Sequence, residues 1–246
     1  SNTMRQRSPS RRVATPLLHT VWKFSETSRD QVRASLTRSY RSPNLGQLIG
    51  RPSVSRTDPA PGANTELTAD SAGNPALRPE VAIGIDVAVE RYLADGGVLS
   101  ANLFHRRIND LIRNVVGLED VSWSPGQPRF VSRPQNIGKA TTQGIELEAK
   151  FRLDQLIDDG PRTEVRANAS VFRSRVDAVP GPDNRLAEQP GGTLNFGVDH
   201  RFRGTPFAVG GNFNHTPGYR TRLEADRFIA QSEKNVLDAY ALWTLS

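Results

Sequence analysis

Arginines and flat aromatic side chains gather in the parts of the sequence that are rich in turn-forming residues. A guanidinium carries its N–H donors in a planar fork that matches a carboxylate or a phosphate, and an aromatic ring offers a flat surface for stacking. The chemistry indicated is non-covalent capture of a large ligand. The alternative is that each residue is solvated, since an isolated surface charge contributes little. The candidate ligand-binding residues are Arg51, Arg56, Trp123, Arg129, Phe130, Arg133, Arg185, Tyr219, Arg220 and Arg222.

Residues suited to catalysis or metal binding show no comparable grouping. The four histidines stand far apart, without the spacing of a metal site. Asp158 and Asp159 lie in the segment LIDDGPR, where aspartate favours a turn rather than an acid–base pair. No nucleophile elbow, P-loop or dinucleotide-binding glycine motif occurs, and without cysteine there is no thiolate site. We therefore predict no catalytic residue, no metal, no cofactor and no enzymatic activity.

Composition and charge narrow the class of partner. Only 36% of the residues are hydrophobic and 24% are charged, with a net charge of +6 to which arginine contributes far more than the four lysines. This balance admits nucleic acid, an anionic ligand or an anionic membrane surface. However, the chain also contains 26 acidic residues, which offset most of the positive charge, and no basic helix or nucleic-acid recognition motif occurs. We therefore predict no nucleic-acid partner.

Period-two alternation is the main structural signal. In VAIGIDVAVERYL the odd positions from Val81 to Val89 are apolar and β-branched, whereas the even positions are small or acidic, which is typical of a strand with two unlike faces. Helical periodicity is limited to residues 154–158 and 224–231, where a turn or short helix is expected. An all-β fold is therefore predicted. The same alternation occurs in QVRASLTRSY, TEVRANASVF, TLNFGVDHRF and PFAVGGNFNH, whereas the C-terminal LDAYALWTLS is mixed.

Short and long connections roughly alternate between these segments. Residues 93–98 and 201–207 suit tight hairpins. The long connections, at 51–80, 117–136, 177–192 and 215–235, are rich in Gly, Pro, Ser, Asn and Asp. An outer-membrane barrel has short turns at one rim and long loops at the other. A soluble β-sandwich that serves as a binding module or adhesin also alternates, and a passive porin-like channel shares the barrel pattern, so both remain alternatives.

Four stretches of the sequence give a more specific signal than the period-two alternation does. They are SYRSPNLGQLIG (39–50), GNPALRPEVAIGIDVAVERYL (73–93), GGVLSANLFHRRINDLIR (96–113) and NIGKATTQGIELEAKF (136–151). In this order and at this spacing they resemble the barrel half of TonB-dependent outer-membrane receptors. The resemblance covers roughly residues 15–246. Any one stretch alone is a weak signal, whereas four in order are specific.

The resemblance implies both a fold and a function. The fold is an antiparallel up-and-down transmembrane β-barrel, of which this chain is a part, from 22 strands closed by an N-terminal plug. The function is active import across the outer membrane of a Gram-negative cell, with a scarce ligand such as a ferric siderophore as cargo. The implied partners are outer-membrane lipid, the energising TonB complex, reached through the missing N-terminal region, and a siderophore or another large ligand, for which the arginines suit an anionic one.

The sequence departs from the complete family pattern at both ends. It has no plug domain and no coupling box, and it stops at Ser246 without the aromatic-ended terminal strand. We therefore expect a fragment in which residues 1–14 are a disordered or loop leader and 15–246 are part of the barrel, without the plug and the final strands. Segments of about ten residues predict eight to eleven strands.

The stretch NIGKATTQGIELEAKFRL illustrates what such a strand requires. Ile145, Leu147 and the following odd positions are expected to face lipid, where polar groups are costly, and the charged even positions to face the lumen. Gly138 is interpreted as a tight approach at the periplasmic end, and Gly144 as a close contact with a neighbouring strand or the plug. Ordinary turn and bulge glycines are the alternative.

Overall fold

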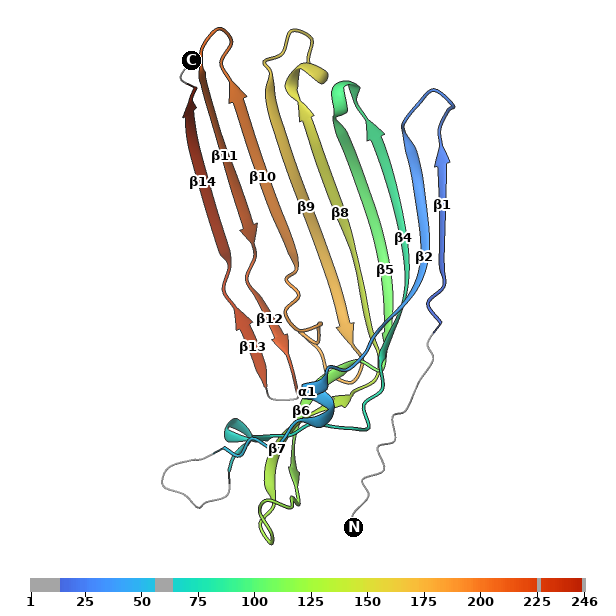
Figure 1. Ribbon diagram of the computed structural model, residues 1–246, viewed down its shortest axis with the longest axis vertical. Helices are drawn as coiled ribbons and strands as arrows, with labels where there is room; N and C mark the ends of the chain where they lie inside the picture. The colour runs from blue at the N-terminus through green and yellow to red at the C-terminus, as the bar shows by residue number, and fades with distance from the viewer. Residues whose placement is uncertain (1–13, 56–63, 225–226, 245–246) are drawn as a thin grey trace, which may run out of the picture.

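A computed structural model describes residues 14–55, 64–224 and 227–244 of the chain. The expected leader, apart from residue 14, and the candidate Arg56 lie outside these residues. The described residues form one nine-stranded antiparallel sheet in the order β1-β2-β4-β5-β8-β9-β10-β11-β14, shown in Figure 1. Its strands are β1 (Leu17–Lys23), β2 (Gln31–Arg41), β4 (Glu80–Tyr92), β5 (Val98–Asn109), β8 (Ala140–Arg152), β9 (Thr163–Val176), β10 (Gly192–Arg201), β11 (Phe207–Thr216) and β14 (Lys234–Trp243).

The sheet confirms the predicted fold class and falls within the predicted number of strands. All pairings within it are antiparallel, and β1 and β14 form its two edges, so that it is not closed into a barrel. The described strands form one layer rather than the two packed sheets of a sandwich. As a consequence, no second sheet among the described strands covers either face of the nine-stranded sheet.

Period-two alternation gives the two faces opposite character. Paired residues share a face, and the register joins Val87, Leu103 and Ile145 across β4, β5 and β8. This apolar face exposes large side chains, including Ile145 at 46% and Leu147 at 50%. The polar face carries the intervening residues, such as Glu146 and Glu148. A soluble protein rarely exposes so large an apolar surface, which therefore suits contact with lipid.

Connections of different length lie at opposite ends of the sheet, as Figure 1 shows. The β1–β2, β4–β5, β8–β9 and β10–β11 hairpins close one end, here called the short-turn end, and include the 3-10 turns η2 (Ala94–Gly96) and η3 (Leu153–Gln155). The four longer connections lie at the other end, the long-connection end. Both tight hairpins predicted from the sequence are confirmed.

The long connections contain secondary structure of their own. A three-stranded loop sheet has the order β3 (Asp70–Ser71), β7 (Arg129–Asn136), β6 (Ile112–Glu119), with β3 parallel to β7. The short helix α1 (Leu45–Ile49) begins at a capping box formed by Asn44 and Gln47, which satisfies otherwise unpaired N–H groups. The remaining elements are η1 (Glu66–Thr68), β12 (Tyr219–Arg222) and β13 (Phe228–Gln231).

The long connection at 117–136 contains secondary structure, because β6 and β7 pair there as a hairpin. One expectation about the connections was wrong. Residues 224–231 hold no helix among the described positions, since β13 pairs with β12. In both connections, pairing between the two strands of a hairpin decides the local structure.

Gly138 and Gly144 behave differently. Gly138 lies between β7 and β8 at the long-connection end, and its φ of +111° favours glycine; its expected position at the periplasmic end stays a prediction. Gly144 confirms the expected close contact with a neighbouring strand. A Cβ there would lie 2.5 Å from the backbone oxygen of Val171 and 2.8 Å from the Phe104 ring.

The hydrophobic core is small and lies next to the long connections. Leu111, Ala140, Val176 and Val179 are buried together. Ile108, Ile137 and Leu186 pack against them. Over the described residues, no helix is long and apolar enough to cross a membrane.

Candidate functional site

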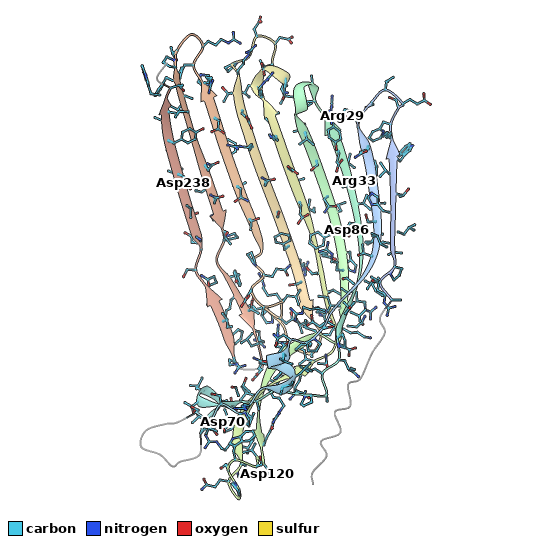
Figure 2. All side chains as sticks on the ribbon, in the orientation of Figure 1. Arg29, Arg33, Asp70, Asp86, Asp120 and Asp238 are labelled. Atoms are coloured by element: carbon cyan, nitrogen blue, oxygen red, sulfur yellow. The ribbon has the colours of Figure 1, made fainter. Side chains whose placement is uncertain are left out.

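The polar face holds a broad concavity of about 500 Å³ across β1, β2, β4, β5, β8 and β9. Cross-strand register places its charged residues in rows, because paired residues of neighbouring strands point to the same face. Figure 2 shows Arg33 and Asp86 on this part of the sheet. Its polar lining consists of His19, Arg33, Ser35, Asp86, Glu90, Ser100, Asn102, Glu146, Glu148, Asn168 and Ser170.

Ion pairs and hydrogen bonds join the rows across strands. Arg33 forms an ion pair with Glu90, whose carboxylate also accepts from Gln31 Nε2 at 2.7 Å and from the Tyr92 hydroxyl at 2.7 Å. Asn102 donates to Glu146 at 3.0 Å. Asp86 pairs with Arg106 at 3.0 Å. Three of the four carboxylates that line the concavity, Asp86, Glu90 and Glu146, therefore already have a partner.

A second charged group lies near the short-turn end of the polar face. Arg166 pairs with Asp199, which also accepts from the Tyr240 hydroxyl. Gly210 makes room for this arrangement, because a Cβ there would lie 2.5 Å from the Tyr240 ring. The group ties β9, β10 and β14 together through side chains that sequence alternation alone does not connect.

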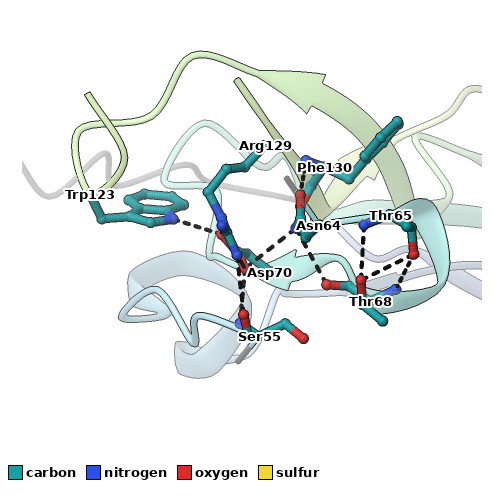
Figure 3. A network of polar contacts seen from close by, with 8 residues as sticks. All are labelled: Ser55, Asn64, Thr65, Thr68, Asp70, Trp123, Arg129 and Phe130. Carbon is teal, nitrogen blue, oxygen red and sulfur yellow. Dashed lines mark hydrogen bonds and ion pairs between the residues drawn. The ribbon is translucent and has the colours of Figure 1, made fainter. Parts of the chain in front are cut away.

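Asp70 organises the long-connection end. Its side chain is fully buried and accepts hydrogen bonds from Arg129 Nε at 2.6 Å, Trp123 Nε1 at 2.8 Å and the Ser55 backbone N–H at 2.9 Å (Figure 3). Asn64 adds a second bridge, because it donates to the Phe130 carbonyl and accepts from the Phe130 N–H, both at 2.8 Å. The connection from β2 to β4 is thereby joined to that from β5 to β8.

The electrostatics of this site favour a permanently charged pair. The hydrogen bond from Arg129 is the main reason why the pKa of Asp70 falls to about 2 from its ordinary 3.8, and the Trp123 and Ser55 N–H groups add to it against the opposing effect of burial. The same contact raises the pKa of Arg129. At neutral pH this pair is a fixed structural link.

Arg133 makes a comparable link within the loop sheet. Its guanidinium donates to Glu119 at 2.6 and 3.1 Å and to the Gly73 carbonyl at 2.5 Å. The hydrogen bond to Glu119 raises the pKa of Arg133. One side chain therefore joins β6, β7 and the segment that leads into β4.

Arg113 connects this unit to the two remaining long connections. It donates to the carbonyls of Arg185, Arg222 and Leu223 at 3.3–3.4 Å. Burial lowers the pKa of Arg113, and the nearby Glu224 carboxylate opposes this effect. The four long connections therefore contact one another in a continuous set rather than standing as separate loops.

The structure places the predicted ligand residues in two groups. Trp123, Arg129 and Arg133 have side chains bonded within the loop sheet and its surroundings, and Phe130 pairs there through its backbone. The second group comprises Arg51, Arg185, Arg220 and Arg222, and it includes Tyr219, which lies on β12 with the last two arginines. Within the described ranges, none of these four arginines forms an ion pair with a carboxylate.

Arg220 and Arg222 both lie over the ring of Phe228. The guanidinium carbons are 3.8 and 4.7 Å from its centroid, which orients two cations without neutralising them. Arg185 lines a polar pocket of about 290 Å³ with Asn184 and Gln189. Arg51 is exposed between α1 and β3. These side chains can contact an anion from several connections.

Sequence reasoning missed the residues that hold the connections together. Asp70 and Asn64 occur in polar, turn-rich sequence with no pattern that marks them, and the Asp70 partner Arg129 is 59 positions away. Arg113 stands at the end of a recognisable strand motif, but nothing local indicates its contacts with residues beyond position 180. Among the described residues, no group of three or more His, Asp or Glu side chains is placed to hold a metal ion.

Comparison with known proteins gives a consistent result. The sequence matches the family described as TonB dependent receptor-like, beta-barrel, over residues 2–246. No curated protein sequence matches it.

Three solved structures illustrate the likeness in fold. They are a variant of the ferric enterobactin receptor PfeA from Pseudomonas aeruginosa in complex with enterobactin (17% identity, TM-score 0.67), the siderophore receptor PirA from Acinetobacter baumannii (15%, 0.63) and the FrpB iron transporter from Neisseria meningitidis (16%, 0.59). Each alignment covers 94% of this chain and 33%, 35% and 32% of the other chain, respectively. The chain therefore spans about a third of the length of these proteins.

Proposed function

This chain belongs to the TonB-dependent receptor β-barrel family, and we propose that it forms part of an outer-membrane receptor that binds and imports a ferric siderophore. The observation that carries the proposal is the sheet itself, with one face apolar and exposed and the other charged. A membrane-spanning strand requires this combination when it separates lipid from a polar lumen. A family of transport receptors also fits a protein that performs no covalent chemistry.

In this proposal the two ends of the sheet have different roles. The short-turn end faces the periplasm, and the long-connection end faces the exterior, where ligand arrives. TonB supplies the energy through a part of the receptor outside this chain. The structural relatives support a siderophore as the class of ligand, since PfeA carries enterobactin in one of their structures.

We propose that ligand capture relies most on Arg185, Arg220 and Arg222, with Tyr219 available for stacking. Their guanidinium groups are not neutralised by carboxylates of the described residues, so they keep their charge for an anionic ligand. The candidates Trp123, Arg129 and Arg133 then shape the site by holding the long connections. A ligand role for all ten candidate residues stays a prediction.

Transport by the complete receptor tests the proposal. A host strain that lacks the gene is grown under iron limitation, and uptake of radiolabelled iron is measured with a panel of ferric siderophores, with and without TonB. We expect the loss of uptake of at least one siderophore and the same loss without TonB. Unchanged uptake of every siderophore in the deletion strain would reject an importer of this class, and uptake that persists without TonB would favour the passive channel.

Binding measurements test the residues. The double variant Arg220→Ala/Arg222→Ala of the complete receptor should bind the transported siderophore at least about tenfold more weakly, because two charged hydrogen-bond donors are lost. Arg91→Ala is the matched control, since Arg91 is an exposed arginine of β4 near the short-turn end. Equal affinity of the double variant and the control would show that these two arginines do not contribute to ligand binding.

A further inference from the structure

The β12–β13 hairpin carries two of the three arginines assigned to ligand capture. We call Arg185, Arg220 and Arg222 the capture arginines. Among the described strands, β12 and β13 have four residues each and pair only with each other, and they extend β11 and β14 beyond the nine-stranded sheet (Figure 1). A two-stranded hairpin is marginally stable in water by itself. Contacts with the rest of the long-connection end must therefore set its orientation.

The two faces of the hairpin have different surroundings. Thr221 is only 1% exposed, whereas the preceding Arg220 is exposed on the other face. Arg222 is the cross-strand partner of Phe228, and both Arg220 and Arg222 lie over the ring of Phe228. One face is therefore docked on the protein. The other face presents the two arginines as a unit whose position follows that of the hairpin.

Arg113 of β6 joins the hairpin to the connection between β9 and β10. Its Nη1 atom donates to the carbonyls of Arg222 and Leu223 at 3.4 and 3.3 Å. Its Nη2 atom donates to the carbonyl of Arg185 at 3.3 Å. A backbone hydrogen bond of 2.8 Å from the Arg222 N–H to the Asp183 carbonyl lies beside these contacts. One guanidinium therefore links the backbones of two capture arginines that come from different connections.

A second contact from β6 holds the hairpin at its turn. The Val116 N–H donates to the Glu224 carboxylate at 3.3 Å, and the same carboxylate pairs with Arg227 at 2.9 Å. This contact reaches the hairpin alone. Arg113, in contrast, fixes the hairpin relative to Arg185.

The backbone of Arg113 stands on a rigid base. The preceding residue, Ile112, is buried, and its N–H donates to the Glu80 carboxylate at 2.7 Å. Glu80 begins β4, is itself buried, and pairs with Arg41 at the end of β2. Leu111 belongs to the hydrophobic core. Arg113 is thereby anchored to the nine-stranded sheet and can serve as a fixed reference point for the hairpin.

The chemistry of Arg113 suits positioning rather than direct capture. Its side chain is half-buried, it forms no ion pair within the part of the chain that the structure describes, and both Nη atoms are engaged with backbone carbonyls. A planar guanidinium offers five N–H donors in a fixed fork, so that it can serve several carbonyl oxygens at once. The ammonium group of lysine is a compact point charge without this fork.

From these contacts we propose that Arg113 is a positioning residue of the capture site. It docks the β12–β13 hairpin at a fixed distance from Arg185, so that the three capture arginines act together on one anionic ligand. The inference rests on the proposed function, because it deepens the role given there to these arginines. Its consequence is that a substitution of Arg113 weakens ligand binding although Arg113 does not touch the ligand.

Distances in the ligand-free complete receptor test the positioning directly. Nitroxide labels are attached through Ala178→Cys and Ala230→Cys, which are exposed positions on the β9–β10 connection and on β13, after any cysteine elsewhere in the receptor is replaced by serine. Electron paramagnetic resonance should give a narrow distribution of label distances in the otherwise unmodified receptor and in the control Arg91→Ala. The distribution should broaden in Arg113→Ala. An unchanged distribution in Arg113→Ala would overturn the proposal.

A double-mutant cycle distinguishes positioning from direct contact. Arg113→Ala should weaken binding of the ferric siderophore identified by the uptake panel about tenfold. It should have little further effect in a receptor that already carries Arg220→Ala/Arg222→Ala, because the hairpin then has no capture arginine to position. An equal loss in both backgrounds would show that Arg113 acts on the ligand independently of the hairpin, and would refute the positioning role.

Arg113→Lys guards against a variant that fails to fold. It keeps the positive charge but not the fork, so it should also bind the siderophore more weakly than the unmodified receptor. Assembly of each variant is judged by a heat-modifiable band on gels, and Arg113→Lys replaces Arg113→Ala in both measurements if the latter does not assemble. Full affinity in Arg113→Lys would show that the charge alone matters and would contradict the proposal.

The two measurements separate this proposal from the proposed function. If the receptor binds no siderophore but the Arg113 variant broadens the distribution of label distances, the proposed function fails and the positioning of the hairpin stands. If a siderophore is bound and imported, and the Arg113 variant changes neither the distances nor the affinity, the positioning role fails alone.

Discussion

The nine-stranded sheet and the loop sheet both contain arginine–carboxylate pairs, but the pairs differ in burial and in what they hold together. On the polar face, the Arg33–Glu90 pair joins strands that are already aligned by backbone hydrogen bonds, and the Arg33 side chain is 45% exposed. In the loop sheet, the Arg129–Asp70 pair has side chains only 12% and 0% exposed, and it joins segments that share just two residue pairings through β3. The sheet would keep its register without its ion pairs, whereas the long connections depend on theirs.

Removal of the buried carboxylate should have the largest effect. In Asp70→Ala, donors on Ser55, Asn64, Trp123 and Arg129 lose their acceptor. Arg129 remains as a nearly buried charge, which costs about 3–5 kcal/mol in comparable sites. Hydrogen exchange of the β7 amides should therefore accelerate about a hundredfold or more, with the amides of β8 unchanged. Asp86→Ala, which breaks an ion pair on the polar face, is the control. Comparable acceleration of β7 in both variants would contradict the distinction between the two regions.

Backbone packing within the sheet gives the next largest effect. Gly144→Ala places a methyl group against the Val171 carbonyl and the Phe104 ring, and overpacking of this kind costs about 1–3 kcal/mol. Gly117→Ala in β6 is the matched control, because nothing lies within 4 Å of its added Cβ. Urea unfolding of the complete receptor in micelles should show a lower midpoint for Gly144→Ala only. Identical midpoints would mean that β9 moves aside without cost.

Acid should loosen the long connections before it affects the sheet. The pKa of Asp70 is about 2 in the folded protein and 3.8 ordinarily, so its contribution of roughly 2 kcal/mol is present above pH 4 and lost as the pH falls through 2. Hydrogen exchange of β7 measured between pH 5 and 2 should reveal a loss of protection, after correction for the intrinsic rate. In Asp70→Asn this pH dependence should disappear, and its persistence would assign the effect to another group.

The smallest effect is expected on the polar face. Arg33→Gln removes an ion pair that is partly exposed to water, and such pairs contribute about 0–1 kcal/mol. Glu90 keeps its hydrogen bonds from Gln31 and Tyr92. The midpoint of urea unfolding should therefore shift only slightly, and less in high salt than in low salt. A loss of several kcal/mol would show that the two regions depend on their ion pairs equally.

The sequence alone predicts the positions of most strands of the nine-stranded sheet. Alternation in VAIGIDVAVERYL and in TEVRANASVF predicts the strands observed as β4 and β9, because a strand with two unlike faces needs a polar or small residue at every second position. The expectation that Ile145 and Leu147 share an apolar face is confirmed by the register. The wrong assignment at residues 224–231 arose where pairing with β12, rather than local pattern, decides the structure.

The sequence by itself determined the strands, their two faces and the division into short and long connections, because these depend on residue patterns along a single segment. Only the tertiary structure decided which arginines are already paired. Arg129 and Arg220 look alike in sequence, but one is paired with Asp70, 59 positions earlier, and the other is held over Phe228 with its charge free of any carboxylate among the described residues. The reason is physical: an ion pair is fixed by distance in space, and the partners in these connections are brought together by β3, β6 and β7 rather than by their separation along the chain.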